Sequence, residues 1–260
     1  MIGTRILVCM KAVPATAQVQ VDGQFRLCRD GVSLQWNVAD ESALEYALRL
    51  RGEQGSVTLL SMGPSVLEES LRELLARGAD EAVLITDPAM AGADTHATAR
   101  ALAAAVEYLG FFDLILCGRR AIDGETGQVP PMLAAALGLP CVTNVERLEA
   151  MADDLIVERR LESGTAQLQV AMPAVVSVCE YSCCLRLPGI MGKRRARQCV
   201  IQTLDAAQLG LSPEQCGLSG SLTKVATMSA KFPGLRKGPK ETDLAAGVEE
   251  LLRLCGEARG

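Results

Sequence analysis

The chain has 260 residues, enough for one large α/β domain and an appendage, since single domains commonly reach about 250 residues. Hydrophobic residues make up 49% of it and aromatic residues only 3%, so the core must be built from Ala, Val, Leu and Ile, which argues against an all-β sandwich. The formal net charge of −5 argues against a general nucleic-acid-binding protein, which needs a surplus of Lys and Arg on one face.

Nothing in the sequence points to export or to membrane insertion. No apolar run is long enough to span a bilayer, and the chain enters a strand-like segment at Arg5 instead of showing a signal peptide. The ten cysteines are spread along the chain, and Cys179, Cys183 and Cys184 form no CxxC pair, so reduced thiols are expected and no metal site is predicted. We therefore expect a cytoplasmic protein.

Short apolar runs alternate with helical patterns through the first half of the chain. The strand-like runs cover residues 5–10, 57–62, 82–85 and 113–117. Helices are expected to begin near Asp40, after the Gly63-Pro64 breaker, near Asp94 and after Gln128. Continuous apolar runs are typical of parallel strands buried on both faces, and the alternation implies right-handed crossovers. The sequence thus predicts an α/β fold with a mostly parallel, doubly wound sheet.

The pattern changes from about Asn144. Residues 155–159 and 166–170 alternate like antiparallel strands around a turn at 162–164. A further strand over residues 173–178 is expected to join the main sheet. After Leu187 the chain becomes basic, and we expect it to be irregular.

The C-terminal part is expected to form an extension arm that ends in a helix. Residues 231–240 are rich in Gly, Pro and Lys, as in a linker, and an apolar stripe follows Thr242, a candidate N-cap. Such a helix would expose apolar surface unless it packs on a partner chain or back on the domain. We divide the chain into a nucleotide-binding α/β domain over residues 1–200 and a C-terminal arm and helix over residues 201–260, which should contact a partner subunit.

Three loops that follow predicted strands or open predicted helices carry small and polar residues. The loop 123–128 contains two glycines, which would let the main chain approach an oxygen, together with a threonine hydroxyl and a glutamine amide. Segments 37–41 and 62–64 occupy corresponding positions. Parallel sheets bind ligands beyond the carboxyl ends of their strands, so these loops favour an adenosine pocket. Glycines in such turns can also be required for folding alone, so a purely structural role for this loop stays open.

Other chemistries are disfavoured. The GxGxxG fingerprint is absent after the first strand, which argues against a standard Rossmann dinucleotide site. His96 is the only histidine, and it follows Asp94 at an expected helix start. Acid–base catalysis or metal binding by histidine is therefore disfavoured. No catalytic residue is predicted.

The chain resembles the electron transfer flavoprotein β-subunit family from residue 5 to about residue 200. The segments that carry the resemblance, in order and with matching spacing, are residues 8–11, 37–41, 62–64, 77–80, 121–129 and 187–191. Each segment alone is weak, and together they are specific to the family.

The resemblance implies a fold and a set of nucleotide contacts. Members of the family have an adenine-nucleotide α-hydrolase-like α/β fold and pair with an α subunit that carries the main FAD. Their contacts carry over onto Cys9, Asn37, Val38, Ala39, Asp40, Met62, Arg119, Ala121, Ile122, Asp123, Gly124, Glu125, Thr126, Gly127 and Gln128. Leu187 matches the apolar residue with which the family anchors a flavin-dependent dehydrogenase, of the acyl-CoA or 2-hydroxy acid type.

Members of the family differ in the nucleotide that this subunit holds. Some bind a structural AMP, and others bind a second FAD and use it for electron bifurcation. The loop 123–126 is short and resembles the FAD-type loop, although Gly127 stands where many FAD-type members have Ala, and Pro130-Pro131 departs from their pattern. The resemblance therefore implies FAD in this subunit, with AMP as the alternative.

A stand-alone adenine-nucleotide-binding regulator or hydrolase of the same fold class is a third hypothesis. It predicts a stable monomer, and the terminal arm with its apolar helix argues against it. For bound flavins the protein supplies position and electrostatics rather than a nucleophile or a base. We therefore expect an electron carrier subunit of an oxidoreductase system, working as a heterodimer, rather than an enzyme acting alone.

Overall fold

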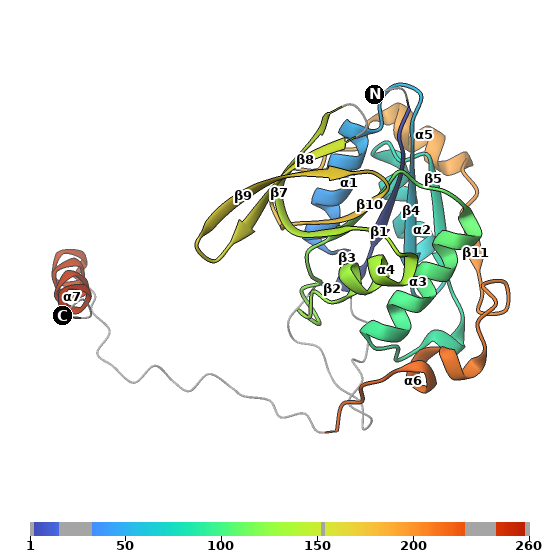
Figure 1. Ribbon diagram of the computed structural model, residues 1–260. Coiled ribbons are helices and arrows are strands. Elements are labelled where there is room, and N and C mark those ends of the chain that lie inside the picture. Colours follow the sequence, from blue (N-terminus) through green and yellow to red (C-terminus); the bar gives the residue numbers. More distant parts are fainter. Residues whose placement is uncertain (1–2, 16–32, 152–153, 227–242, 258–260) are drawn as a thin grey trace. The chain divides into compact units, whose positions relative to one another are not determined.

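The computed structural model describes residues 3–15, 33–151, 154–226 and 243–257 (Figure 1). Residues 1–225 form one compact unit, and residues 226–260 form a second, which is described by itself below. The first unit extends beyond the division near residue 200 that the sequence suggested.

The first unit is built on a nine-stranded sheet with the strand order β11-β5-β4-β1-β6-β10-β7-β8-β9. The strands are β1 (Arg5–Met10), β4 (Ser56–Met62), β5 (Glu81–Ile85), β6 (Leu114–Gly118), β7 (Cys141–Met151), β8 (Asp154–Leu161), β9 (Gly164–Ala171), β10 (Ala174–Val178) and β11 (Gln202–Leu204). Neighbours from β11 through β7 are parallel, and β8 and β9 are antiparallel additions at one edge. A separate two-stranded ribbon pairs β2 (Ala12–Pro14) with β3 (Leu34–Trp36).

Helices cover both faces of this sheet, as the sequence predicted. The helices of the first unit are α1 (Val38–Leu50), α2 (Leu67–Ala76), α3 (Thr95–Leu109), α4 (Val129–Leu137), α5 (Ile190–Gln198) and α6 (Gly217–Gly220), with short turns η1 (Pro88–Met90) and η2 (Pro213–Gln215). One core packs α1 and α2 against the sheet, and a second core packs α3 and α4 against the opposite face. The doubly wound α/β fold is therefore confirmed.

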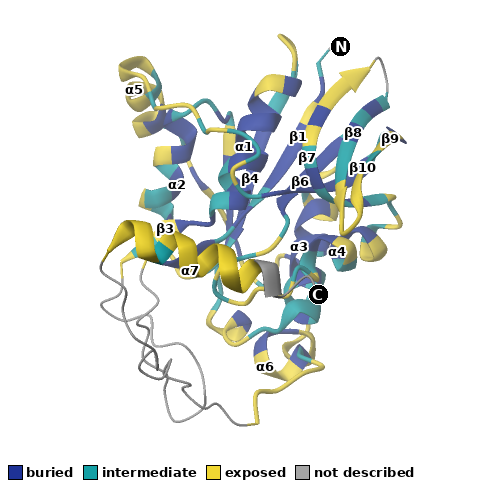
Figure 2. Cartoon of the chain, turned by 90° about the vertical axis from the view of Figure 1, so that its left-hand side faces the viewer, coloured by how far each residue is buried: buried dark blue, intermediate teal, exposed yellow. Residues whose placement is uncertain are grey.

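The central strand shows why the pattern gives this fold. In β1, Ile6 and Val8 point into the α1–α2 core, whereas Leu7 between them points into the α3–α4 core, and all three are fully buried. Alternate residues of a strand point to opposite faces, so a continuous apolar run serves two cores at once. Figure 2 shows the central strands in the colour of buried residues.

The basic segment after Leu187 is a helix, and the expectation of irregular chain there was wrong. Helix α5 lies against α2, where Arg72 donates to the Cys199 carbonyl at 2.7 Å and Arg195 donates to the Ala79 carbonyl at 2.7 Å. A Cβ atom on Gly192 would lie 2.1 Å from the Ala76 carbonyl oxygen, so glycine is needed for this close packing. The helix depends on contacts that are distant in the sequence.

Two strands of the nine-stranded sheet, β7 and β11, were not predicted, and neither were β2 and β3 of the ribbon. The first part of β7, residues 141–145, pairs in parallel with β10, and the second part, residues 145–151, pairs in antiparallel with β8. Asn144 in the first part has a positive φ of 59°. That left-handed residue interrupts the alternation by which a strand is recognised. Strand β11 has three residues and pairs with β5 at one edge of the sheet, so the compact unit includes chain past residue 200.

The second unit contains the predicted C-terminal helix, α7 (Leu244–Glu257). The Asp243 carboxylate accepts hydrogen bonds from the amides of Ala245 at 2.9 Å and Ala246 at 3.0 Å, so Asp243 caps the helix. Thr242, the cap suggested by the sequence, and the predicted linker over residues 231–240 lie outside the described residues. Apolar residues of α7 such as Leu251 and Leu252 are exposed.

No helix within the described ranges is long and apolar enough to cross a membrane. Every cysteine in the described part of the chain is a free thiol. In the same residues, no three His, Cys, Asp or Glu side chains are grouped as metal ligands.

Candidate functional site

One side chain ties the carboxyl ends of β1 and β6 to the start of α1. Asp40 lies in the first turn of α1 and is buried. One carboxylate oxygen accepts hydrogen bonds from the Gly118 amide and from Asn37 Nδ2, both at 3.0 Å, and the other accepts one from the Lys11 amide at 2.8 Å. The two strand ends and the helix start are thereby held as one unit.

Gly118 makes this close approach possible. A Cβ atom at Gly118 would lie 2.2 Å from Oδ1 of Asp40 and 2.7 Å from Cβ of Ala39. Both distances are far inside van der Waals contact, so a larger residue would push the start of α1 away from the end of β6.

Burial raises the pKa of Asp40 to about 7. Hydrogen bonds from Asn37, from the amides of Lys11 and Gly118, and the positive charge of Lys11 lower the pKa and offset part of the desolvation. Asp40 therefore titrates near neutral pH, where an exposed aspartate with a pKa of about 3.9 is fully ionised.

Asn37 joins the start of α1 to the segment of residues 119–128, which follows β6 and is called the 119–128 loop below. Its buried side chain donates from Nδ2 to the Arg120 carbonyl at 3.0 Å and accepts at Oδ1 from the Ile122 amide at 3.3 Å. Although Asn37 is the N-cap residue of α1, its side chain makes no cap hydrogen bond to the helix. Its amide group instead fixes the loop.

Two ion pairs hold the same loop. Nζ of Lys11 lies 2.7 Å from Oδ1 of Asp123, whose side chain is only 8% exposed. Nη2 of Arg119 lies 2.6 Å from Oε1 of Glu180. Within the described residues, Nε of Arg119 and Oε2 of Glu180 are buried without a hydrogen-bond partner. Buried polar atoms are normally paired. These two atoms, next to the end of β6, are therefore an exception, and each could still form a hydrogen bond.

The tip of the 119–128 loop is open. Gly124, Glu125 and Thr126 are exposed, and a Cβ atom on Gly124 would meet nothing within 4 Å. Glu125 has a φ of 50° and Gly127 a φ of 62°. A left-handed conformation costs a residue other than glycine about 1–2 kcal/mol, and such strain concentrates at functional loops.

The loop ends at α4, whose N-terminus is a weaker anion site than the sequence motif suggests. Pro130 and Pro131 in its first turn carry no N–H group, so fewer main-chain donors face the loop. Gln128 connects the loop to α3, because its Oε1 accepts a hydrogen bond from the Thr95 hydroxyl at 3.0 Å. An anion at this position would therefore depend more on the side-chain groups of the loop than on the helix N-terminus.

The other predicted nucleotide contacts lie at the same edge of the sheet. Cys9 is near the end of β1 and Met62 ends β4, and both are half-buried. Val38 and Ala39 stand in the first turn of α1, and Ala121 lies in the loop. Because β4, β1 and β6 are neighbours and parallel, their carboxyl ends bring these residues together.

Leu187 belongs to a different surface, between β10 and α5. Its exposed fraction is 85%, and Ile190 and Met191 beside it are 87% and 73% exposed. Large apolar side chains grouped in this way are typical of a surface that contacts another molecule.

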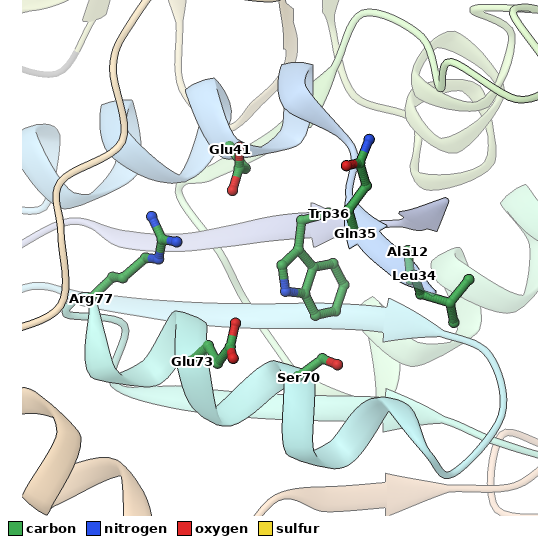
Figure 3. A pocket seen from close by; sticks show the side chains of 8 residues that line it. All are labelled: Ala12, Leu34, Gln35, Trp36, Glu41, Ser70, Glu73 and Arg77. Atoms are coloured by element: carbon green, nitrogen blue, oxygen red, sulfur yellow. The ribbon is translucent and has the colours of Figure 1, made fainter. Parts of the chain in front are cut away.

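A third feature is a cavity of about 220 Å³ beside α1 and α2. Figure 3 shows Glu41 projecting from α1 and Ser70 and Glu73 from α2, with the indole of Trp36 between the two helices. Burial raises the pKa of Glu41, and the charge of Arg77 opposes that shift. The cavity is lined by none of the predicted nucleotide contacts.

Three residues that shape the site were not among the predicted contacts: Lys11, Gly118 and Glu180. Gly118 carried a signal, since a glycine that ends a buried strand ahead of a polar loop indicates close main-chain approach. The contacts of Lys11 and Glu180 join residues far apart in the chain, and no local pattern reports them.

Comparison with known proteins gives one consistent result. A family model described as "Electron transfer flavoprotein domain" matches residues 25–209. An electron transfer flavoprotein subunit beta of Thermoanaerobacterium thermosaccharolyticum is 44% identical over 227 residues, covering 86% of this chain and 87% of the relative. The corresponding subunit of Megasphaera elsdenii is 41% identical over 229 residues, covering 85% of each chain.

A third relative is named as part of a larger assembly. The "Caffeyl-CoA reductase-Etf complex subunit CarD" of Acetobacterium woodii is 40% identical over 224 residues, covering 85% of this chain and 86% of the relative.

Proposed function

The chain belongs to the electron transfer flavoprotein β-subunit family, and from this premise we propose that it holds a FAD of its own at the carboxyl edge of its sheet. The observation that carries the proposal is the 119–128 loop, which is open at its tip and fastened at its base by Asn37 and Lys11. A fastened base with an exposed, strained tip suits a nucleotide that is gripped by main chain and small side chains.

The donors at this edge fit the phosphates and ribose of an adenine dinucleotide. Thr126 offers a hydroxyl, Gln128 an amide, and Arg119 a buried Nε that has no partner in the described chain. FAD, when bound, supplies the electron-transfer chemistry. The residues of this chain bind its adenylate part, orient the flavin and exclude water, and none of them acts as a nucleophile or base.

Electron bifurcation is part of the proposal, because family members with FAD in this subunit use it in that way. The alternative is a structural AMP at the same edge, which would leave the α subunit with the only flavin. A stand-alone nucleotide-binding regulator remains the least supported candidate, because the family works as heterodimers.

Counting flavins tests the proposal directly. The heterodimer with the α subunit should release two FAD per dimer on denaturation, measured by absorbance and chromatography. One FAD together with released AMP would reject FAD in this subunit and leave the AMP alternative.

The side-chain donors of the loop should govern retention of the nucleotide. Thr126→Val combined with Gln128→Leu should speed its dissociation about tenfold, since two lost hydrogen bonds are worth about 1–3 kcal/mol. Cofactor content after timed dialysis of the heterodimer measures the effect. A matched double variant on β9, Thr165→Val with Gln167→Leu, replaces exposed residues of the same types and should retain the wild-type content. Equal retention in both variants would contradict a nucleotide site at the 119–128 loop.

We propose two partner surfaces as well. The C-terminal arm and α7, with its exposed apolar stripe, would contact the α subunit. Leu187 would enter an apolar site of a flavin-dependent dehydrogenase. The name of the Acetobacterium relative joins an Etf to a reductase of a CoA ester, which favours a dehydrogenase of the acyl-CoA type over one for 2-hydroxy acids. A cytoplasmic location follows from this role.

A further inference from the structure

A buried carboxylate lies beneath the segment that carries Leu187. Glu45, in the middle of α1, has a side chain that is 4% exposed. It accepts hydrogen bonds from the Arg186 amide at 3.1 Å, from Nε and Nη2 of Arg186 at 3.0 Å each, and from Nε of Arg49 at 2.8 Å. Both oxygens face the guanidinium of Arg186, so the pair is bidentate, the arrangement that fixes geometry most firmly.

Glu45 stays ionised in this environment. Burial by itself would raise its pKa, but the hydrogen bonds from Arg186 and Arg49 outweigh the desolvation and hold the pKa below its ordinary value. A buried charge with two cationic partners resists separation, because opening the pair would leave the carboxylate unpaired.

Neighbouring side chains fasten the same stretch of main chain. The Ser42 hydroxyl donates to the Cys183 carbonyl at 3.2 Å, and Nη1 of Arg77 donates to the Arg186 carbonyl at 3.3 Å. The Tyr46 hydroxyl is near the Ser182 carbonyl at 3.4 Å. Residues 182–186 are thus attached to α1 and α2 at several main-chain atoms.

This attachment contrasts with the residues that follow. Leu187, Ile190 and Met191 are largely exposed, yet the chain before them is held by Glu45 and the chain after them by the contacts of α5 with α2. An apolar group between two fixed points needs little ordering when a partner binds it, so most of the entropic cost is met during folding.

We propose that Glu45 is a positioning residue for the docking of the flavin-dependent dehydrogenase: through Arg186 it fixes the chain that presents Leu187. The proposal rests on the proposed function of this surface. Glu45 does not touch the partner or the flavin, so its effect should fall on recognition and not on electron transfer within the bound complex.

Two measurements on the heterodimer test the role of Glu45. In Glu45→Gln, amide hydrogen exchange of a peptide spanning residues 182–191 should become about tenfold faster, since local opening becomes easier. With an acyl-CoA dehydrogenase as electron donor, the KM for the heterodimer should rise about tenfold while kcat stays within about twofold. Glu107→Gln is the matched control, because that exposed side chain belongs to α3, on the opposite face of the sheet from α1 and α2, and should change neither quantity.

Leu187→Ser separates failure of this inference from failure of the proposed function. If Leu187→Ser raises the KM and Glu45→Gln does not, the positioning role is overturned while the docking surface stands. If neither variant changes the KM, docking uses another surface and both proposals fail.

A double-mutant cycle covers the case in which Glu45→Gln weakens the fold. Arg186→Met removes the other partner, whose side chain is 43% exposed. Combined with Glu45→Gln it should raise the KM no more than the larger single effect, because both variants break one contact. Additive effects, or an equal fall in kcat, would overturn the inference.

Discussion

Gly118→Ala should abolish nucleotide retention and lower the free energy of unfolding by about 3 kcal/mol, the upper range for an overpacked buried site. The added Cβ atom would lie 2.2 Å from Oδ1 of Asp40, 2.7 Å from Cβ of Ala39 and 2.8 Å from the Asp40 amide nitrogen. The start of α1 must move, and the hydrogen bond from the Gly118 amide to Asp40 is lost with it. Urea unfolding and cofactor content after dialysis measure the two effects.

Gly189→Ala is the control for this variant. Gly189 lies outside the 119–128 loop, its φ of −77° suits alanine, and an added Cβ would meet nothing within 4 Å, so retention should stay at the wild-type level and stability should change by less than about 1 kcal/mol. If Gly118→Ala retains the nucleotide as well as Gly189→Ala does, the close approach of α1 to β6 is not what forms the site.

Replacing Asp40 by Asn should remove a pH dependence of stability. Because burial raises the pKa of Asp40 to about 7, the folded state binds a proton more tightly than the unfolded state does. The stability contributed by this group is fully present below about pH 4, is lost as the pH rises through 7, and stays constant above that. The thermal midpoint of the wild type should therefore fall, relative to that of Asp40→Asn, between pH 4 and 7.

The same substitution should also speed loss of the nucleotide at pH 8, since Asn offers one acceptor oxygen where the carboxylate offers two. Glu107→Gln, on the exposed side of α3, is the control for the pH experiment and should keep the wild-type profile. Parallel profiles of the wild type and Asp40→Asn would show that Asp40 does not titrate in this range.

The parts of the fold that the sequence predicted are those with a local signature. Continuous apolar runs indicated β1, β4, β5 and β6, and the hairpin of β8 and β9 had the alternation expected for antiparallel strands. The confirmed order of strand and helix follows from these runs.

The parts that were missed depend on distant contacts. Helix α5 is held by Arg72 across 127 residues of sequence, and β11 is a strand only because it pairs with β5. Its three residues carry no period of their own. Strand β7 was hidden because Asn144 breaks its alternation.

The candidate site divides in the same way. Family resemblance supplied the residues from Cys9 to Gln128, and the structure gathers them at one edge of the sheet. Family resemblance could not show that Gly118 contacts Asp40, 78 residues away in the sequence, or that Lys11 pairs with Asp123, 112 residues away. Such pairings are created by the strand order and not by neighbours in the chain.

The position of Asp40 has a consequence for proton balance. The carboxylate form accepts all three of its hydrogen bonds, and these bonds set the spacing of the segments that would surround a nucleotide. A ligand that prefers this spacing also prefers the ionised form, and thermodynamic linkage makes the preference mutual. Binding of a nucleotide at this edge near neutral pH would then release a proton from Asp40 to solvent. Protons would therefore compete with the nucleotide, and its affinity should fall as the pH falls.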